Sequence, residues 1–261
     1  MLKAYKYRIY PTEAQRVLIN KHIGACRLVY NLALEVKNTA YKSQGLNLSA
    51  IDLINQLPEL KAECLWLSEV HSQALQQSIL NLGKAFTCFF KVQAGYPAYK
   101  SKFRGNQAFR SPHGRYIQIQ SGKVFLPKFR EGIKIVQDNR QIRGAIKSAT
   151  LSRSKTGKYF ISILVDTLVA APVKVPVCAD TAIGIDLGIK SFIATSNGKF
   201  IDNPKHLIKS IERLKVLQRR LRNKKKGSKN REKATRRIAV IHTEDCCHPR
   251  EGVKPAKGLF T

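Results

Sequence analysis

Acidic side chains are scarce in this sequence. Its 261 residues include 17 Asp and Glu against 47 Lys and Arg, which gives a formal net charge of +30 and a pI near 10.2. Positive charge in such excess repels itself within a folded chain unless a polyanion neutralises it. The imbalance therefore predicts that the partner is a nucleic acid.

The chain also lacks long apolar runs. No stretch of about 18 apolar residues occurs, so we expect no transmembrane helix. The first residues, MLKAYKYRIYPTE, do not contain the apolar centre of a signal peptide. Positive charge is spread along the chain rather than gathered in one amphipathic segment, which disfavours a membrane-surface protein. We therefore expect a cytoplasmic, nucleoid-associated bacterial protein with no membrane partner.

Cysteine pairs with the spacing of metal ligands are absent too. The cysteines are scattered, no Cys-x-x-Cys occurs, and with no export signal we expect reduced thiols. Cys26 and Cys88 fall at apolar helix positions, which predicts that both lie in a core. Cys246, Cys247 and His248 lack tetrahedral ligand spacing and a second cysteine pair, so no zinc site is expected.

The most informative stretch is Thr181–Asn203. Alternate positions from Ile183 to Leu187 are apolar, and Gly184, Asp186 and Gly188 occupy the opposite face of the predicted strand. The two glycines remove side-chain bulk, so a metal or a phosphate backbone can approach Asp186 closely. A carboxylate in this setting is therefore a candidate metal ligand.

The rest of this stretch predicts an antiparallel meander. A second strand over Phe192–Thr195 leads into the turn Ser196–Lys199, whose Asn-Gly pair accepts positive φ, and Phe200 begins a third strand. An Asp on a first strand followed by such a meander is how an RNase H-like sheet opens. In nucleases with that sheet, the first-strand Asp binds a catalytic divalent metal.

Two other interpretations of the same stretch stay open at this point. One is an ordinary core hairpin in which Asp186 caps a turn. The other is an actin-like ATPase sheet, which also opens with a GIDLG-like run. Such ATPases usually continue with small hydroxyl residues that hold phosphate, whereas Ile189 and Lys190 follow here. No Gly-rich phosphate loop follows downstream, and the ATPase interpretation leaves the positive charge unexplained.

The first part of the chain predicts a strand, then helices, then short strands. Leu2–Tyr10 forms a strand, and a capping box at Thr12 opens a helix that runs to about Lys42. A short helix over Ser49–Gln56 and a long helix over Ser68–Val92 follow. Short strands are predicted over Tyr116–Gln120, Lys123–Leu126, Gly132–Val136, Ser148–Arg153 and Lys158–Val165. We expect a small β-barrel that the N-terminal strand completes, with the helices inserted.

Two basic regions are candidate nucleic-acid surfaces. The segment from Tyr96 to Arg104 interleaves aromatic rings, which can stack on bases, with cations that meet phosphates; the alternative is an irregular strand with snorkelling lysines. Its candidate contacts are Tyr96, Tyr99, Lys100, Lys102 and Arg104. From Lys205 to Arg237, 15 Lys or Arg face only 2 Glu over a predicted helix pair that bends at Gly227-Ser228. Its candidate contacts are Arg219, Arg220, Arg222, Lys224, Lys225 and Lys226. Glu212 and Glu232 are interpreted as local ion-pair partners.

Four runs in this order resemble the TnpB/OrfB proteins of bacterial insertion sequences. They are YKYRIYPTEAQ; GACRLVYNLAL, with Arg27, Tyr30 and Asn31; FFKVQAGYPAYKSK; and GIDLGIKSFIATSNG, with Asp186. The resemblance covers roughly residues 1–240. It implies an RNA-guided, Mg²⁺-dependent DNA endonuclease linked to transposition, with guide RNA and DNA as partners and a separate transposase of the same element as a further partner. It adds Arg27, Tyr30 and Asn31 to the candidate nucleic-acid contacts.

The resemblance also implies a domain plan for a mixed α+β chain. Residues 1–10 and 94–167 would form a wedge-like β-barrel, residues 11–93 a helical recognition insert, and residues 168–180 a linker. Residues 181–240 would form the opening part of a RuvC-type, RNase H-like domain. In the family, the first-strand Asp joins a later Glu and a further Asp to hold two Mg²⁺ ions, and a four-cysteine zinc ribbon lies between those later acids.

The sequence departs from the family after Asp186. The later acids, Asp202, Glu212, Glu232, Glu244, Asp245 and Glu251, do not lie in strand-like apolar surroundings, and the ribbon cysteines are missing. From His242 the helical period is lost, and residues 241–261 are expected to form an atypical, disordered tail of a frameshifted or truncated C-terminus. We therefore expect an incomplete Mg²⁺ site at Asp186, no cleavage by this chain, and a marginal fold after about Asn203. The alternative is a nuclease-dead RNA- or DNA-binding regulator, or a vestigial fragment.

Overall fold

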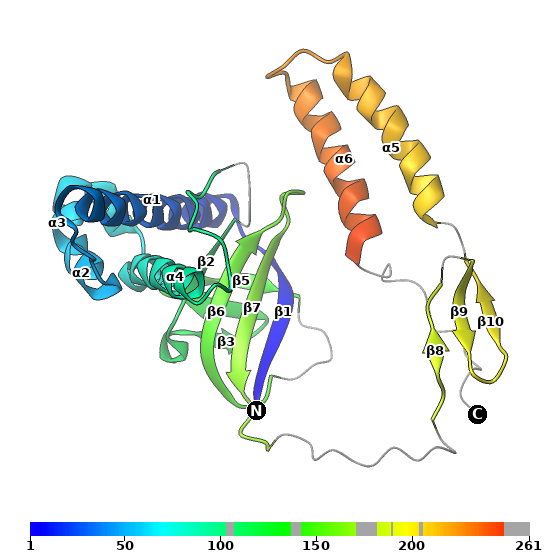
Figure 1. Ribbon diagram of the computed structural model, residues 1–261, viewed down its shortest axis with the longest axis horizontal. Helices are drawn as coiled ribbons and strands as arrows, with labels where there is room; N and C mark the ends of the chain where they lie inside the picture. Colours follow the sequence, from blue (N-terminus) through cyan, green and yellow to red (C-terminus); the bar gives the residue numbers. More distant parts are fainter. Residues whose placement is uncertain (103–106, 137–141, 171–181, 189, 204–205, 248–261) are drawn as a thin grey trace. The chain divides into compact units, whose positions relative to one another are not determined.

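The computed structural model describes residues 1–102, 107–136, 142–170, 182–188, 190–203 and 206–247 (Figure 1). The chain divides into two compact units, Met1–Ala171 and Pro172–Thr261. Most of the predicted linker, residues 168–180, and the whole region from His248 onward lie outside the described residues.

A seven-stranded antiparallel sheet is the framework of the first unit, in the order β2-β6-β7-β1-β5-β4-β3. The strand that opens the chain, β1, lies inside the sheet between β7 and β5, and it pairs with β7 from Leu2↔Asp166 to Ile9↔Tyr159. The strands are β1 Leu2–Tyr10, β2 Gln107–Ser111, β3 Gln118–Gln120, β4 Lys123–Leu126, β5 Phe129–Ile135, β6 Ala145–Arg153 and β7 Tyr159–Asp166. The fold is therefore mixed α+β with a large antiparallel sheet. Among the described residues no pairing joins the end strands β2 and β3, so closure into a barrel stays a prediction.

The strands β5 and β6 begin three residues earlier than predicted, and two larger differences occur before them in the chain. The predicted strand over Tyr116–Gln120 is wrong in its first part, since a 3-10 turn, η2 (Gly114–Tyr116), precedes β3. Gly114 allows this turn because a Cβ there would stand 1.6 Å from the carbonyl oxygen of Ile146. The strand β2 was not predicted, because its sequence follows directly on the basic segment and has weak alternation.

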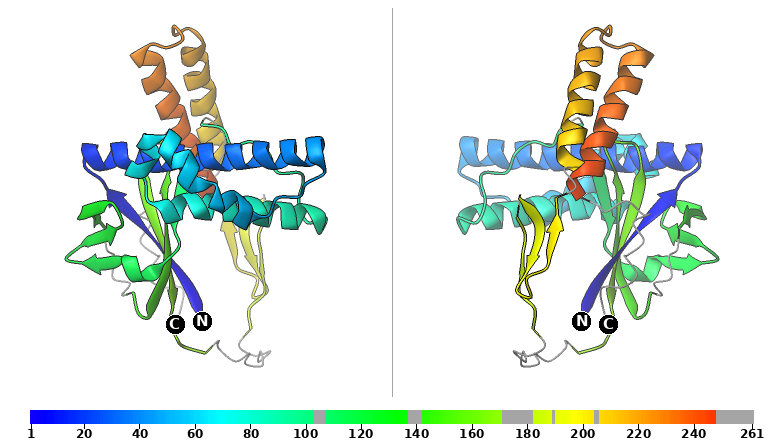
Figure 2. Two further views of the ribbon diagram at one scale, coloured as in Figure 1. Left: turned by 90° about the vertical axis from the view of Figure 1, so that its left-hand side faces the viewer. Right: turned by 90° about the vertical axis from the view of Figure 1, so that its right-hand side faces the viewer.

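The helices stand between β1 and β2 in the chain, and α1 and α4 lie side by side (Figure 2). They are α1 Glu13–Gln44, α2 Ala50–Asn55, α3 Leu57–Glu63, the 3-10 helix η1 Leu65–Glu69 and α4 Ser72–Phe90. The predicted capping box at Thr12 is confirmed, with Gln15 as its partner. The predicted helix over 68–92 is divided, since η1 ends at Glu69 and α4 begins at Ser72.

The buried face of α1 is shifted from the stripe that its apolar residues alone would form. Leu32 and Val36 are each 38% exposed, whereas Tyr30 and Cys26 are buried. Cys26 is thus a core residue as expected, while Cys88 of α4 is only half-buried. The shift arises because polar residues, His22 among them, take places on the buried face that an apolar pattern does not count.

His22 joins α1 to the sheet. Its ring is fully buried and stands 4.8 Å from the ring of Phe109 and 5.5 Å from that of Phe129, measured between centroids. Its Nδ1 donates to the Leu18 carbonyl oxygen at 2.9 Å, and its Nε2 accepts the His71 backbone N–H at 3.2 Å. Burial lowers the pKa of His22 to about 4, and the positive charges of His71 and Lys128 act in the same direction.

The second unit opens with a three-stranded antiparallel sheet, in the order β10-β9-β8, followed by two helices. Its elements are β8 Ile185–Asp186, β9 Ser191–Thr195, β10 Phe200–Asp202, α5 His206–Arg222 and α6 Lys229–Cys247. The predicted meander and the bend between two helices are both confirmed. The prediction of a tail from residue 241 is wrong for its first residues, since α6 continues to Cys247. None of the described helices is both long and apolar enough to cross a membrane.

Acidification is expected to destabilise the Met1–Ala171 unit through His22. The folded pKa is about 4 and the ordinary value is 6.5, so the unfolded chain binds the proton first. The stabilisation is complete above pH 6.5 and is lost as the pH falls toward 4, by roughly 3 kcal/mol in total. Urea unfolding followed by the fluorescence of the single tryptophan, Trp66, measures this loss.

The test compares the pH dependence of stability in two variants, His22→Gln and His113→Gln. His113 is exposed, so its substitution is the matched control. The His22 variant should lose most of the dependence of stability on pH between 6.5 and 4, and the His113 variant should keep it. A wild-type free energy of unfolding that stays constant over this interval would show that His22 does not control it.

Candidate nucleic-acid interface

The segment Gly95–Lys102, here called the strap, is bonded to α1. The Tyr96 hydroxyl donates to Asn38 Oδ1 at 2.5 Å, and the Tyr99 hydroxyl donates to the Glu35 carboxylate. Asn31 Nδ2 donates to the Lys100 carbonyl oxygen at 3.0 Å, while the Lys100 backbone N–H donates to Asn31 Oδ1 at 2.8 Å. The Asn31 amide thus pairs with the strap backbone on both its donor and its acceptor side.

A cation–π contact supports the same attachment. The Lys100 ammonium lies 3.8 Å from the centroid of the Tyr30 ring, and Tyr30 is buried. Burial lowers the pKa of Lys100 and raises the pKa of Tyr30. Two residues predicted from the family resemblance to contact nucleic acid, Tyr30 and Asn31, are therefore engaged inside the unit, and their contact with nucleic acid stays a prediction.

The aromatic side chains of the strap are partly used in packing as well. Tyr96 and Tyr99 are each 54% exposed, and the Tyr96 ring meets the edges of Phe86 and Phe89 with centroids 5.6 and 5.3 Å away. The strap contains no strand, and Lys102 at its end is exposed, so contact of the strap with nucleic acid stays a prediction. Arg104 lies outside the described residues.

A pocket of about 780 Å³ opens beside the strap. Three cations line it from three different elements, namely Arg27 of α1, Lys100 of the strap and Arg110 of β2, and no Asp or Glu is among the lining residues. Arg110 donates to Ser148 Oγ at 2.9 Å, while its buried Nε has no hydrogen-bond partner among the described residues. Arg27 donates to Gln107 Oε1 at 3.3 Å.

Amide and hydroxyl groups complete this pocket. Gln77, Ser78 and Asn81 line it from α4, and Thr150 lines it from β6. Cations without acidic neighbours attract anions, and the amides and hydroxyls can donate or accept hydrogen bonds. The pocket can therefore hold a phosphate-bearing, hydrogen-bonding ligand. Arg110 was not singled out in the sequence, because a lone arginine in a short strand gives no signal.

The second basic region is a helical hairpin formed by α5 and α6. The candidate contacts Arg219, Arg220, Arg222, Lys225 and Lys226 are exposed, and Lys224 is half-buried. Arg231 fixes the end of α5, because its Nη1 donates to the carbonyl oxygens of Leu221 at 3.0 Å and of Lys224 at 2.7 Å. Ser228 Oγ accepts the Arg231 backbone N–H at 3.2 Å and begins α6. The structure thus holds the bend in one conformation.

The two glutamates of the hairpin do not act as predicted. Neither Glu212 nor Glu232 forms an ion pair with another residue of the described part of the chain. The interpretation of these residues as local ion-pair partners is therefore wrong. Apart from Arg231, whose guanidinium binds two backbone carbonyl oxygens, the arginines of the described hairpin have no acidic partner within it.

Asp186 lies in β8, opposite Ala194 of β9, and is exposed. The neighbouring apolar residues Ile183, Ile185 and Leu187 are exposed as well, and β8 holds only two residues. No group of three His, Cys, Asp or Glu that could hold a metal occurs within the described residues. A two-metal site needs several carboxylates in one place, so the described residues do not fit such a site.

The described cysteines do not form a metal centre. Cys26, Cys64 and Cys88 are free thiols, and burial raises the pKa of Cys26 to about 12. Cys178 and His248 lie outside the described residues. Cys246 and Cys247 belong to the last turns of α6, where the side chains are not described.

Asn31→Ala is expected to loosen the strap. The change removes two hydrogen bonds to the Lys100 backbone, at a cost of roughly 2 kcal/mol. Trypsin should then cleave after Lys100 or Lys102 faster than in the wild type, as mass spectrometry of the fragments would show. Asn55→Ala, at an exposed position, is the matched control. Equal cleavage rates in all three proteins would mean that Asn31 does not hold the strap.

Comparison with known proteins gives two family profiles. One, described as a helix-turn-helix domain of OrfB from IS605-type elements, matches residues 1–45. In this structure those residues form one strand, β1, and one helix, α1, rather than a helical pair. The other, described as "Probable transposase" and also named for OrfB, matches residues 166–246. The similarity thus extends past residue 240, where the sequence pattern alone placed its end.

Two curated relatives cover almost the whole chain. One, from Streptomyces pristinaespiralis, is 36% identical over 244 residues, covering 92% of this chain. The other, InsQ from Escherichia coli (strain K12), is 32% identical over 244 residues, covering 93% of this chain. Both names describe an RNA-guided DNA endonuclease. The chain spans 59% of the length of each relative.

Among solved structures, a CRISPR-Cas12f ternary complex matches 89% of this chain and 57% of its own chain, with a TM-score of 0.38 and 14% identity. A likeness at this level supports no assignment. The two profiles and the two curated relatives agree with each other and with the four sequence runs. The chain belongs to the TnpB/OrfB family of insertion-sequence proteins.

Proposed function

We propose that this chain binds RNA and DNA through the cationic surfaces described above, with a guide RNA as its specific partner, and that it does not cut DNA by itself. The observation that carries the proposal is the pocket beside the strap, where three cations meet without a carboxylate among the lining residues. The names of the two curated relatives support RNA guidance. Because the chain spans 59% of their length, their whole activity is a hypothesis for this chain.

Overall charge supports the same conclusion. A formal net charge of +30 on 261 residues leaves far more cations than the acids of the chain can pair. The ion pairs among the described residues are few and largely exposed, so they neutralise little of this charge. A polyanion is the ligand that removes this self-repulsion, and its binding should fall steeply as salt rises.

We infer the absence of DNA cleavage from the lack of further carboxylate ligands near Asp186 among the described residues. In-line phosphodiester hydrolysis with two metals requires carboxylates that converge on both ions. Asp186 stands without such companions in the described residues. The chain would then act as a nucleic-acid-binding member of its family, in the bacterial cytoplasm near the nucleoid, where a separate transposase of the same element could meet it.

RNA bound to the chain in its host is the first test. The protein, purified from its host at low salt, should carry one discrete RNA species that maps beside its own gene. RNA sequencing of the purified sample identifies that species. A mixture of unrelated RNAs, or no RNA, would remove guide RNA from the proposal.

The pocket can be tested in the same chain. Arg27→Gln combined with Arg110→Gln is expected to weaken binding of a labelled nucleic acid about tenfold, because two phosphate contacts are lost. Arg115→Gln combined with Arg130→Gln removes the same charge from exposed positions and should change binding less. Equal effects of the two pairs would mean that only net charge matters.

Cleavage is tested with the purified chain, its RNA, target DNA and Mg²⁺. No cut product is expected on a denaturing gel, and Asp186→Ala should leave binding affinity unchanged. Mg²⁺-dependent cutting that disappears in Asp186→Ala would contradict the proposal and make the chain a nuclease.

A further inference from the structure

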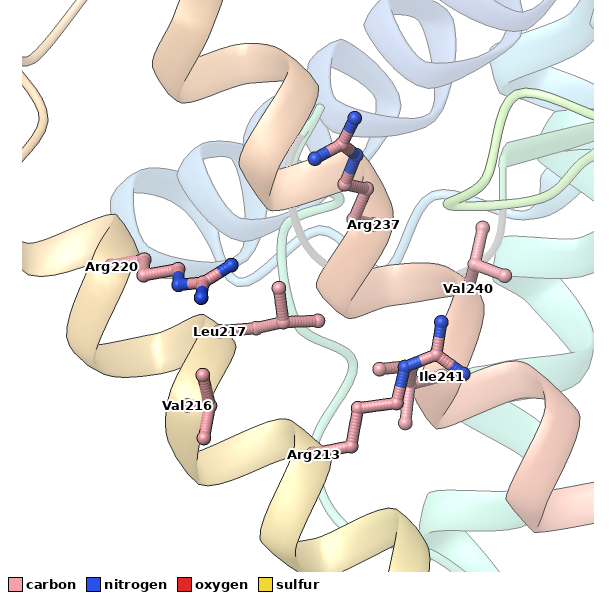
Figure 3. A pocket seen from close by; sticks show the side chains of 7 residues that line it. All are labelled: Arg213, Val216, Leu217, Arg220, Arg237, Val240 and Ile241. Atoms are coloured by element: carbon pink, nitrogen blue, oxygen red, sulfur yellow. The ribbon is translucent and has the colours of Figure 1, made fainter.

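A second cationic site lies between the helices of the hairpin. The groove has a volume of about 770 Å³, and three arginines line it: Arg213 and Arg220 from α5, and Arg237 from α6 (Figure 3). Leu217, Val240 and Ile241 form its apolar part. We propose that this groove, here called the hairpin groove, holds the sugar–phosphate backbone of a single nucleic-acid strand. The inference deepens the proposed function and rests on it.

The arginines have no partner within the described part of the protein. All three are exposed, and none of them takes part in a hydrogen bond, ion pair or ring contact there. In Figure 3 the side chains of Arg213 and Arg220 extend from α5 toward α6. Guanidinium groups bind phosphate with two parallel hydrogen bonds, so three of them around one groove favour a phosphate-bearing ligand.

Their spacing favours a polymer over a single phosphate ion. Arg213 and Arg220 are seven residues apart, which is about two helical turns, so they stand on one side of α5 about 10 Å apart along its axis. In Figure 3 the two guanidinium groups lie at different places along the groove, an arrangement that suits a chain of phosphates better than one phosphate ion. Successive phosphates of one strand can contact both, with Arg237 approaching from the other helix.

The apolar part of the groove suits a sugar–phosphate chain. Leu217 is half-buried and Ile241 is buried, and in Figure 3 Leu217 lies between the two α5 arginines. An apolar surface between cations excludes water from the bound phosphates and can contact the ribose carbons between them. A site for a small inorganic anion would need polar hydrogen-bonding groups between the arginines in place of this apolar surface.

Hydrogen bonds join the two helices of the hairpin at their bend. Arg231 bonds the last carbonyl oxygens of α5, and Ser228 caps the start of α6, so the two helices are fixed at the bend. Because this rigidity exists before binding, little conformational entropy is lost when a strand enters. The hairpin is therefore a preformed site and not only a charged surface.

The experiment compares two triple variants of the full chain. Arg213→Gln, Arg220→Gln and Arg237→Gln together remove the charge of the groove; Lys215→Gln, Lys233→Gln and Arg236→Gln remove the same charge from exposed positions elsewhere on the hairpin. Fluorescence anisotropy with a labelled single-stranded RNA, and with DNA of the same sequence, gives affinity at several salt concentrations. The groove variant should bind at least tenfold more weakly, and its salt slope should be smaller by about 2. The control should lose less than threefold.

The outcomes separate this inference from the proposed function. Equal losses in the two triple variants would overturn the hairpin groove and leave nucleic-acid binding intact. A wild-type chain that binds neither RNA nor DNA would overturn both. Tighter binding of a poly-glutamate peptide than of either strand, lost in the groove variant, would show that the groove serves an acidic protein partner.

Chemical protection tests the wild-type chain without any substitution. Phenylglyoxal modifies accessible guanidinium groups, and mass spectrometry reports the extent at each arginine. A bound RNA strand should protect Arg213, Arg220 and Arg237 more than Arg236, which is exposed on α6 outside the groove. Inorganic phosphate at the same phosphate concentration should protect none of them. Protection by the free ion equal to that by the strand would overturn the inference of a strand site.

Discussion

The pairing of β1 with β7 is the constraint on which the first unit depends. Leu2 pairs with Asp166 and Ile9 with Tyr159, so the two ends of this unit form neighbouring strands inside one sheet. Everything between them must leave the sheet and return to it. The helices occupy the first part of that path, and the strap carries the chain from α4 back across α1 to β2.

The pairing of β1 with β7 explains the position of the pocket beside the strap. The pocket lies where the path returns, between α1, α4, the strap and β2, and each of these elements supplies part of its wall. Its cations come from positions 27, 100 and 110, which only the fold brings together. Because no Asp or Glu is among the described residues that line the pocket, its three cations are not neutralised. The hairpin groove in the second unit also lacks lining carboxylates among the described residues, but its cations come from two helices that are consecutive in the sequence.

Local signals in the sequence predicted the features that depend on local chemistry. The capping box at Thr12, the Asn-Gly turn at Gly198 and the bend at Gly227 each need only a few adjacent residues, and each is present. Features that depend on distant partners were not predictable in this way. The amide of Asn31 binds a backbone 69 positions away, and the imidazole of His22 lies between two rings of the sheet. The same limit applies to Asp186, whose sequence setting marks a metal ligand without revealing whether other carboxylates stand beside it.

The way Asn31 holds the strap separates attachment from recognition. Its amide bonds the backbone of residue 100 and not a side chain, so this anchor does not depend on which side chains the strap carries. The side chains of neighbouring strap residues can therefore vary during evolution while the strap stays bound to α1. Since the strap forms one wall of the pocket, members of the family could alter what the pocket accepts without rebuilding the fold around it.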